Sequence, residues 1–279
     1  MADLLTGRTL QVLACPLCGK PFDRVGSSLR CADAHSFDIS RHGYASLTTG
    51  GGPHFRGDSA EMVAARGAHL AAAHYAPIAD AIAGLAPAAG WLVELAGGTG
   101  YYAASVLDAA PSLHGVSIDV SKAAARVAAR AHDRLASVTA DVRATLPIAS
   151  GSTSMVLSVF GPRGAAEIVR ILEPGGSLVV VTPLESHLVE LRERFSLLNI
   201  GSDKEARLRE SLAPLELAGS TELEYMIDLD RRDVADVIMM GPNAFHNDRS
   251  SIEARAATAM PEVLPVTVAV TVSRFHSPR

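Results

Sequence analysis

Short apolar segments alternate with amphipathic ones through the chain beyond residue 90. The segments 92–95, 115–119, 137–141, 155–160 and 177–182 are predicted to be strands, with helices between them. Two further strands are expected at 222–228 and 266–275, and helices near 230–240 and 248–258. This alternation predicts a doubly wound α/β fold built around a parallel sheet.

The chain before residue 90 is organised differently. The glycine-rich stretch Thr48–Pro53 predicts a flexible joint, so we expect two domains, one at 1–53 and one at 54–279. The segment 37–47 is predicted to supply a short strand or two that complete the first domain.

The composition fits a soluble globular protein, with 48% hydrophobic and 20% charged residues among 279. No apolar run approaches the roughly 20 residues of a membrane span, and no secretory signal is evident, so we expect a cytoplasmic protein without a membrane partner. The net charge of −5 argues against broad, nonspecific binding of DNA or RNA. Residues 1–57 are net positive, with six basic and four acidic side chains, so a polyanion would meet this part first.

All three cysteines lie within the first 31 residues. Cys15 and Cys18 form one close pair, and Cys31 and His35 form a second pair after a short loop. This spacing predicts a tetrahedral Cys₃His zinc site, whose four protein ligands make the metal structural. The odd number of cysteines argues against disulfides, and free buried thiols are the remaining alternative.

A glycine loop follows the strand at 92–95. It has the pattern Glu94-x-Ala96-x-Gly98-x-Gly100, and the next strand ends at the carboxylate of Asp119. Such a pairing holds an adenosine-containing cofactor, because the glycines admit the ligand and the acid accepts hydrogen bonds from ribose hydroxyls. A nicotinamide site would show the full G-x-G-x-x-G pattern, whereas an acidic strand end resembles the first motif of S-adenosylmethionine (SAM) methyltransferases. Alanine at position 96 is tolerated there if its φ stays negative.

Taken together, these motifs resemble the 23S ribosomal RNA guanine-N1 methyltransferases over about residues 12 to 275. The segments at 97–100 and 159–163 are more similar to the actinobacterial branch that confers resistance to tylosin-type macrolides. The resemblance rests on Cys15-Pro16-Leu17-Cys18, Cys31-x-x-x-His35-x-Phe37-Asp38, Gly43-Tyr44, Gly57-Asp58-Ser59-Ala60-Glu61-Met62-x-x-Ala65-Arg66, His74-Tyr75-x-Pro77, Asp119-Val120-Ser121-Lys122 and Pro174-Gly175-Gly176.

The resemblance implies a Rossmann-like class I SAM methyltransferase sheet with a small N-terminal zinc-binding domain that recognises 23S ribosomal RNA, and often a homodimer. It places cofactor contacts on Tyr75, Gly98, Thr99 and His187, with His187 expected one turn into the helix after the fifth strand. Together with the residues of the loop and strand ends, the candidate cofactor-binding set is Tyr75, Glu94, Gly98, Thr99, Gly100, Asp119, Asp141 and His187.

The candidate catalytic residues follow the fourth strand. Phe160 could stack on guanine, or fill the core; Arg163 could bind guanine O6 or a phosphate, or form a surface salt bridge. Asp141 is expected to meet the adenine amino group rather than act as a base. Guanine N1 carries a proton that must leave before methyl transfer, and the sequence identifies no general base for it.

Two other functions stay open. A small-molecule methyltransferase of secondary metabolism would share the large domain, but such enzymes rarely need a zinc module. A non-catalytic zinc or RNA adaptor with a degenerate cofactor fold would be consistent with Ala96 and the negative net charge. The leading hypothesis is SAM-dependent methylation of guanine N1 in a hairpin loop of 23S ribosomal RNA.

Overall fold

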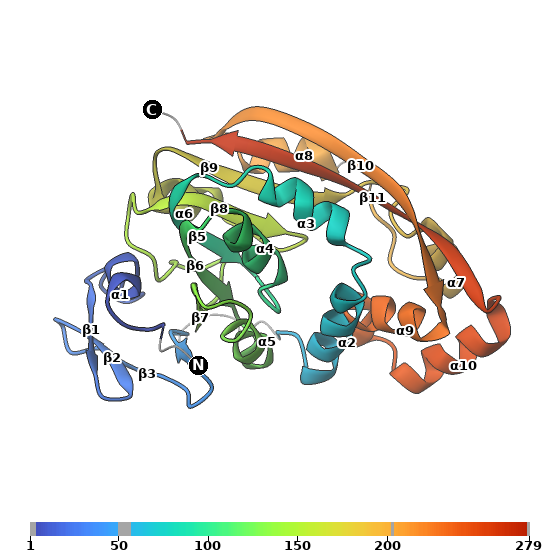
Figure 1. Ribbon diagram of the computed structural model, residues 1–279, viewed down its shortest axis with the longest axis horizontal. Helices are drawn as coiled ribbons and strands as arrows, with labels where there is room; N and C mark the ends of the chain where they lie inside the picture. The colour runs from blue at the N-terminus through green and yellow to red at the C-terminus, as the bar shows by residue number, and fades with distance from the viewer. Residues whose placement is uncertain (1–3, 50–56, 202–203, 278–279) are drawn as a thin grey trace.

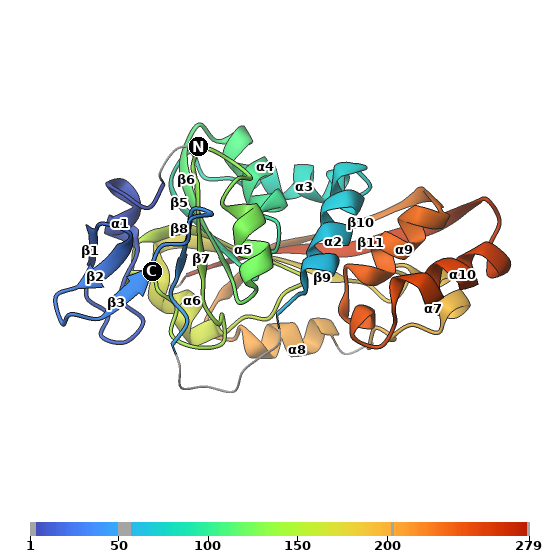
Figure 2. The ribbon, with the colours of Figure 1, turned by 90° about the horizontal axis from the view of Figure 1, so that it is seen from below.

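The computed structural model describes residues 4–49, 57–201 and 204–277. A small module lies at one end of an elongated molecule, a large sheet with its helices forms the middle, and a helical group lies at the other end (Figures 1 and 2). Within the described residues, no helix is long and apolar enough to cross a membrane.

The N-terminal module is built from α1 (Arg8–Val12) and a three-stranded antiparallel sheet of β1 (Phe22–Val25), β2 (Ser28–Cys31) and β3 (Ser36–Asp38). Its short core is anchored to the large domain by backbone hydrogen bonds. The amide of Ala14 donates to the carbonyl of Pro147 (3.0 Å), and the amide of Ala149 donates to the carbonyl of Val12 (2.8 Å). The module and the sheet therefore share one hydrophobic cluster.

The large sheet has eight strands in the order β10-β11-β9-β8-β5-β6-β7-β4. The strands from β9 to β4 run parallel, and β11 and β10 are antiparallel to their neighbours. The strands are β4 (Tyr44–Ser46), β5 (Ala89–Leu95), β6 (Ser112–Asp119), β7 (Leu135–Thr139), β8 (Thr153–Val159), β9 (Leu172–Pro183), β10 (Glu216–Asp230) and β11 (Val263–His276). The predicted parallel α/β sheet is therefore confirmed.

One strand differs from the prediction. The segment 37–47 was expected to complete the first module, and β3 does so. However, β4 pairs in parallel with β7, with Ser46 opposite Thr139, and extends the edge of the large sheet. A local pattern cannot show this, because the partner strand lies about 90 residues away. The predicted joint and the boundary between residues 53 and 54 lie largely outside the described residues.

Helices cover both faces of the sheet, because side chains alternate along each buried strand. Leu92, Met155 and Val179 face one hydrophobic cluster, whereas Val93 and Val156 face the other. Helices α2, α3, α4, α7, α9 and α10 contribute to the first cluster, and α6 and α8 contribute to the second. Their bounds are α2 (Ala60–Ala71), α3 (Ala76–Ala83), α4 (Tyr101–Ala109), α5 (Lys122–Ala128), α6 (Ala165–Ile171), α7 (Val189–Phe195), α8 (Lys204–Ser211), α9 (Arg231–Met239) and α10 (Arg249–Ala259).

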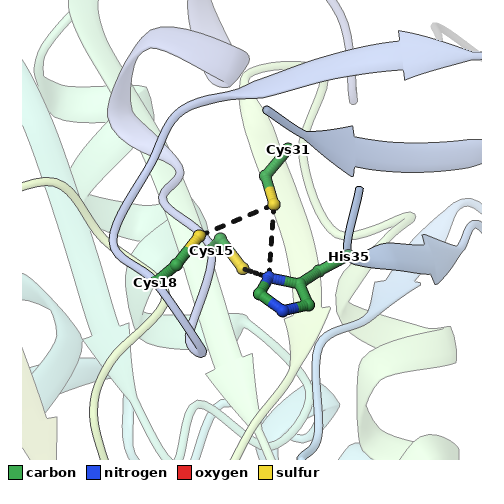
Figure 3. A group of neighbouring side chains, drawn as sticks. All are labelled: Cys15, Cys18, Cys31 and His35. Carbon is green, nitrogen blue, oxygen red and sulfur yellow. Dashed lines mark hydrogen bonds between the residues drawn. The ribbon is translucent and has the colours of Figure 1, made fainter. Parts of the chain in front are cut away.

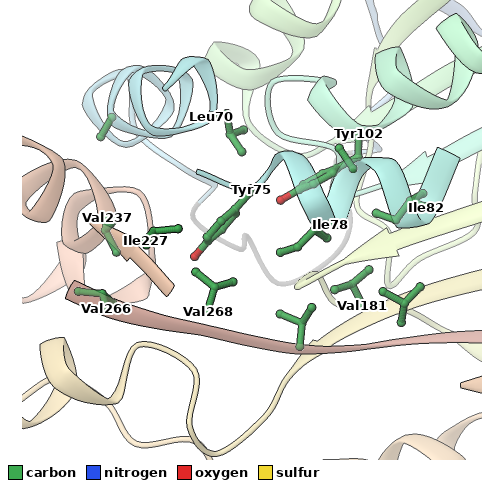
Figure 4. Close-up of a cluster of buried hydrophobic side chains, with 14 of the residues drawn as sticks. Leu70, Tyr75, Ile78, Ile82, Tyr102, Val181, Ile227, Val237, Val266 and Val268 are labelled. Carbon is green, nitrogen blue, oxygen red and sulfur yellow. The ribbon is translucent and has the colours of Figure 1, made fainter. Parts of the chain in front are cut away.

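The helical group between β10 and β11 covers the carboxyl ends of the central strands. Asp230 and Asp233 form a reciprocal capping box that starts α9, and Arg249 at the start of α10 pairs with the buried Asp236 at 2.6 Å. The apolar faces of α2, α3 and α9 meet side chains of β10 and β11. Tyr75, which precedes α3, and Tyr102 of α4 lie in the same cluster (Figure 4). This packing places α2 and α9 beside the cavity described next.

Candidate active site and metal centre

The four predicted metal ligands lie together in the N-terminal module. Cys15 and Cys18 come from the turn after α1, Cys31 from the end of β2, and His35 from the loop before β3 (Figure 3). Their ligand atoms all lie within 4.8 Å of one another. In the part of the chain that the structure describes, this is the only such group of three or more potential metal ligands.

The distances fit a tetrahedral zinc ion. Zinc–ligand bonds of about 2.3 Å to sulfur and 2.1 Å to nitrogen place two sulfur atoms about 3.8 Å apart and a sulfur and a nitrogen about 3.6 Å apart. The Sγ atoms of Cys18 and Cys31 are 3.6 Å apart, and His35 Nδ1 lies 3.5 Å from Cys15 Sγ and 3.4 Å from Cys31 Sγ. Since four protein ligands complete the shell, the zinc is structural.

A cavity of about 570 Å³ opens at the carboxyl ends of β5, β6 and β8. The ends of parallel strands in doubly wound sheets are where cofactors bind. Seven of the eight predicted cofactor residues line it, together with the predicted catalytic Phe160; the seven are Tyr75, Glu94, Gly98, Thr99, Asp119, Asp141 and His187. Residues from distant parts of the chain therefore lie around one cavity, and the cofactor and catalytic roles expected for them stay predictions.

Asp119 holds the glycine loop in place. Its Oδ2 accepts a hydrogen bond from the amide of Gly98 (2.9 Å), and its Oδ1 accepts one from the amide of Ser121 (2.8 Å). Gly98 has a φ of +56°, which suits glycine. Burial raises the pKa of Asp119, while these two amides oppose that change. The carboxylate therefore fixes the loop and still faces the cavity.

Gly100 does not line the cavity. It has a φ of +76° and precedes α4, and a Cβ atom there would lie 2.9 Å from Leu135 and 3.3 Å from Ala128. Its role in this structure is the close approach of α4 to α5 and β7. The prediction that Gly100 belongs to the cofactor site is therefore not supported by its position.

Ala96 does not have the negative φ that the sequence analysis expects of an alanine in this loop. Its φ is +52°, in the left-handed region, rather than negative. A side chain costs about 1 kcal/mol or more there, because Cβ approaches the following carbonyl. The methyl group packs against the loop after β8, where a Cβ added to Gly161 would lie 2.9 Å from Ala96 Cβ. The left-handed backbone of Ala96 thus occurs where this loop and the loop after β8 approach each other closely.

Glu94 is almost fully buried at the end of β5. Burial raises the pKa of its carboxyl group to about 8, and the hydrogen bond from Ser117 Oγ (3.4 Å) only partly offsets this. At neutral pH the group is therefore mostly protonated in the ligand-free cavity. A cation bound beside it would favour the ionised form.

Tyr75 and His187 meet at the far side of the cavity. The Tyr75 hydroxyl lies 3.3 Å from His187 Nε2, and the amide of Ala269 donates a hydrogen bond to His187 Nδ1 (3.2 Å). Because Nδ1 accepts, neutral His187 carries its proton at Nε2 and donates it to the tyrosine oxygen. The hydroxyl proton of Tyr75 can then point into the cavity. Burial also raises the pKa of Tyr75 and keeps it a donor.

His187 lies outside the helix predicted for it. It precedes α7 and follows β9 in a turn, so the expectation that it lies one turn into a helix is wrong. β9 ends at Pro183, and Leu188, next to His187, has a φ of +55° as the N-cap of α7, so the helix begins only at Val189.

Phe160 is exposed at the mouth of the cavity. It is 42% exposed, has a φ of +54°, and its ring stacks on His187 with centroids 5.8 Å apart. The alternative in which Phe160 fills the core is therefore excluded. Strained backbone of this kind persists where surrounding structure holds it, often at functional sites.

Arg163 lies beyond this cavity, on a neighbouring one. Its Nη1 donates to the carbonyl of Gly161 (3.1 Å) and lies 3.5 Å from Ser158 Oγ. It forms no ion pair with any residue in the described ranges, so the surface salt bridge considered for it is not found.

The sequence reasoning missed Arg66 on α2. Its guanidinium pairs with Asp58 (2.6 Å) and donates to the carbonyl of Met240 at the end of α9 (2.6 Å). A Cβ on Gly98 would lie 2.8 Å from Arg66 Nη1, so this side chain crosses the glycine loop. Arg66 connects α2, the glycine loop and α9, and these contacts between distant segments have no signal in the local sequence.

The sheet, the glycine loop and the acidic strand ends define a class I SAM-dependent methyltransferase fold carrying an N-terminal zinc ribbon. Residues 13–48 match the family model described as RlmA, N-terminal, a zinc ribbon. A chain in the complex between the Haloferax volcanii Trm112 methyltransferase activator and a methyltransferase shares the fold, with a TM-score of 0.51, 22% identity, and coverage of 81% of this chain and 100% of that one.

Two relatives match nearly the whole chain. A 23S rRNA (guanine-N(1)-)-methyltransferase of Micromonospora griseorubida is 41% identical, covering 95% of this chain and 97% of the relative. The 23S rRNA (guanine(748)-N(1))-methyltransferase of Streptomyces fradiae is also 41% identical, covering 94% and 95%. The chain therefore belongs to the 23S rRNA (guanine-N1) methyltransferase family.

Replacing a zinc ligand is expected to unfold the small module and spare the large one. Cys18→Ser leaves three ligands, and since metal binding supplies much of the folding free energy of such modules, the variant should lose zinc. We expect elemental analysis to show one zinc per wild-type chain and much less than one in the variant, with trypsin cleaving within residues 20–41. Leu17→Ser, an exposed neighbour in the same turn, is the control and should keep its zinc. A zinc-free wild-type protein would contradict the site.

Substituting Ala96 by glycine tests the left-handed backbone. At φ +52° the change should raise the free energy of unfolding by up to about 1 kcal/mol, measured by urea denaturation. Ala140→Gly, at a buried loop position without positive φ, should instead lower it by about 0.4–1 kcal/mol. If Ala96→Gly lowers the free energy of unfolding as much as Ala140→Gly does, the left-handed backbone at Ala96 carries no strain.

Proposed function

We propose that this protein transfers the methyl group of SAM to N1 of a guanine in 23S ribosomal RNA. The observation that carries the proposal is the similarity to the 23S rRNA relatives across both modules, the zinc ribbon as well as the catalytic domain. A small-molecule methyltransferase would need only the second module. The geometry of the cavity supports the same reaction.

The cavity offers a partner for each polar part of SAM. We assign Asp119 to the ribose hydroxyls, Asp141 to the adenine amino group and Glu94 to the methionyl ammonium. Gly98 and Thr99 lie in the loop beside them, and Tyr75 with His187 faces the methionyl carboxylate as donors. SAM supplies the methyl group as a sulfonium, a good leaving group, so alignment of the acceptor is the main task of the chain.

Phe160 is assigned to the acceptor. It is an exposed aromatic ring at the mouth of the cavity, close to where the methyl group would be presented. A guanine taken out of its RNA stack can stack on such a ring, which offsets part of the cost of unstacking.

A basic surface next to the zinc ribbon supports an RNA substrate. Lys122 and Arg126 on α5, Arg130 just beyond it and Arg41 from the loop before β4 are exposed, and none forms an ion pair within the described residues. Partial burial and repulsion from the three arginines lower the pKa of His42, which shows that these charges converge. In a protein with net charge −5, such a cluster suits RNA phosphates.

Three finer statements extend this proposal. We propose that the protein acts in the cytoplasm as a homodimer, and that the modification reduces the binding of tylosin-type macrolides. The Streptomyces fradiae relative is named for guanine 748, and primer extension on 23S RNA identifies the nucleotide that this protein modifies.

Methylation of ribosomal RNA is the direct test. Purified protein with radiolabelled SAM should label 23S RNA that lacks the modification, and primer extension should stop at one guanine because an N1-methyl group blocks Watson–Crick pairing. Asp119→Ala should abolish both the label and SAM binding, since it removes the anchor of the loop. SAM binding without RNA labelling would favour a small-molecule substrate, and no SAM binding would favour the adaptor.

Proton release on SAM binding tests the role assigned to Glu94. Its pKa of about 8 lies above the ordinary value near 4.5, so at pH 7 the free protein holds a proton there. A bound ammonium group favours the ionised carboxylate, so binding should release up to about one proton. Calorimetry in buffers of different ionisation enthalpy measures this number, which should fall to near zero in Glu94→Gln. An unchanged release in that variant would assign the proton to another group.

A further inference from the structure

A second cavity of about 370 Å³ adjoins the first. Phe160 and Gly161 line both cavities, so the two cavities meet at the loop after β8. The rest of the second cavity is formed by Arg163, by Val181, Thr182 and Pro183 at the end of β9, and by Leu208 and Ser211 of α8. It therefore lies at the carboxyl ends of β8 and β9, next to the cavity assigned to SAM.

Among the residues whose side chains the structure describes, Arg163 is the only charged one in the wall of this second cavity. The side chain is half-buried, and burial lowers its pKa with no carboxylate to oppose the change. Within the described part of the chain, its Nε is buried without a hydrogen-bond partner, and the partners of Nη1 are the neutral oxygens of Gly161 and Ser158. A partly desolvated cation without a counterion is costly, so its retention indicates an anionic or strongly polar ligand.

The shape and lining of the cavity narrow the choice of ligand. Phe160, Pro183 and Leu208 present apolar surfaces, which suit a planar ring better than a hydrated phosphate. One guanidinium beside these surfaces matches a purine that carries partial negative charge on an exocyclic oxygen. Guanine ionised at N1 is such a ligand, because the charge is shared with O6.

We propose that the second cavity receives the target guanine, with Phe160 against its ring and the guanidinium of Arg163 on O6, where it stabilises the N1 anion. This assignment rests on the proposed function and names the subsite for its acceptor. The N1 proton passes to solvent water, the N1 lone pair forms a bond to the methyl carbon, and the carbon–sulfur bond breaks with its electron pair on sulfur. No protein side chain is then required as a general base.

The pH dependence of methyl transfer separates this role from a structural one. For Arg163→Gln, single-turnover transfer to guanine at pH 7 should fall about 10²–10³-fold, as for loss of an oxyanion-stabilising donor. Its rate should still rise about tenfold per pH unit where the wild-type rate has levelled off, since N1 ionises less readily. Arg163→Lys should recover part of the loss. Arg232→Gln, on the exposed start of α9, is the charge-matched control and should behave as wild type.

A substrate that needs no ionisation gives a second readout. RNA carrying 2-aminopurine at the target position has neither O6 nor an N1 proton, so wild type and Arg163→Gln should methylate it at equal rates. SAM affinity should be the same in both proteins. A loss that is equal at every pH and persists with 2-aminopurine would overturn the assignment and leave Arg163 a loop-stabilising residue. Failure of the wild type to methylate guanine N1 would instead refute the proposed function itself.

Discussion

The site depends on two backbone hydrogen bonds that the carboxylate of Asp119 accepts. One oxygen holds the amide of Gly98 and the other holds the amide of Ser121, so the glycine loop after β5 and the start of α5 are fixed by a single side chain. Both segments follow neighbouring parallel strands, whose carboxyl ends meet at one edge of the sheet. Cofactor binding at this edge requires the loop to be fixed before the ligand arrives.

Around this anchor, several contacts depend on one another. Ala96 holds a left-handed backbone while its methyl group packs on Gly161, and Phe160 beside that glycine is also left-handed. The loop assigned to the methyl donor and the loop assigned to the acceptor are therefore in direct contact. Each strained residue costs about 1 kcal/mol or more, and the packing between the loops offsets that cost. A shift in one loop would move the other, which keeps donor and acceptor in register.

The zinc ribbon is tied to the catalytic domain more closely than a flexible joint would suggest. Backbone pairing at Ala14 and Ala149 and the shared hydrophobic cluster fix one side, and β4 enters the large sheet on the other. An RNA held by the ribbon and by the basic surface of α5 would thus meet the cavity at a defined distance. The metal stabilises a module whose own core is small.

The sequence by itself determined the elements and their chemistry. The period of the apolar segments predicted the parallel sheet, the Cys₃His spacing predicted the metal site, and the glycine loop with Asp119 predicted the cofactor edge, because each depends on residues close in sequence. Only the tertiary structure decided what depends on distant contacts. It moved β4 into the large sheet, gave Ala96 its positive φ through Gly161, placed Gly100 behind the loop, and brought Arg66 across it. It also placed Arg163 in a second cavity, with no counterion among the described residues, which no local pattern specifies because the walls come from the loop after β8, from β9 and from α8.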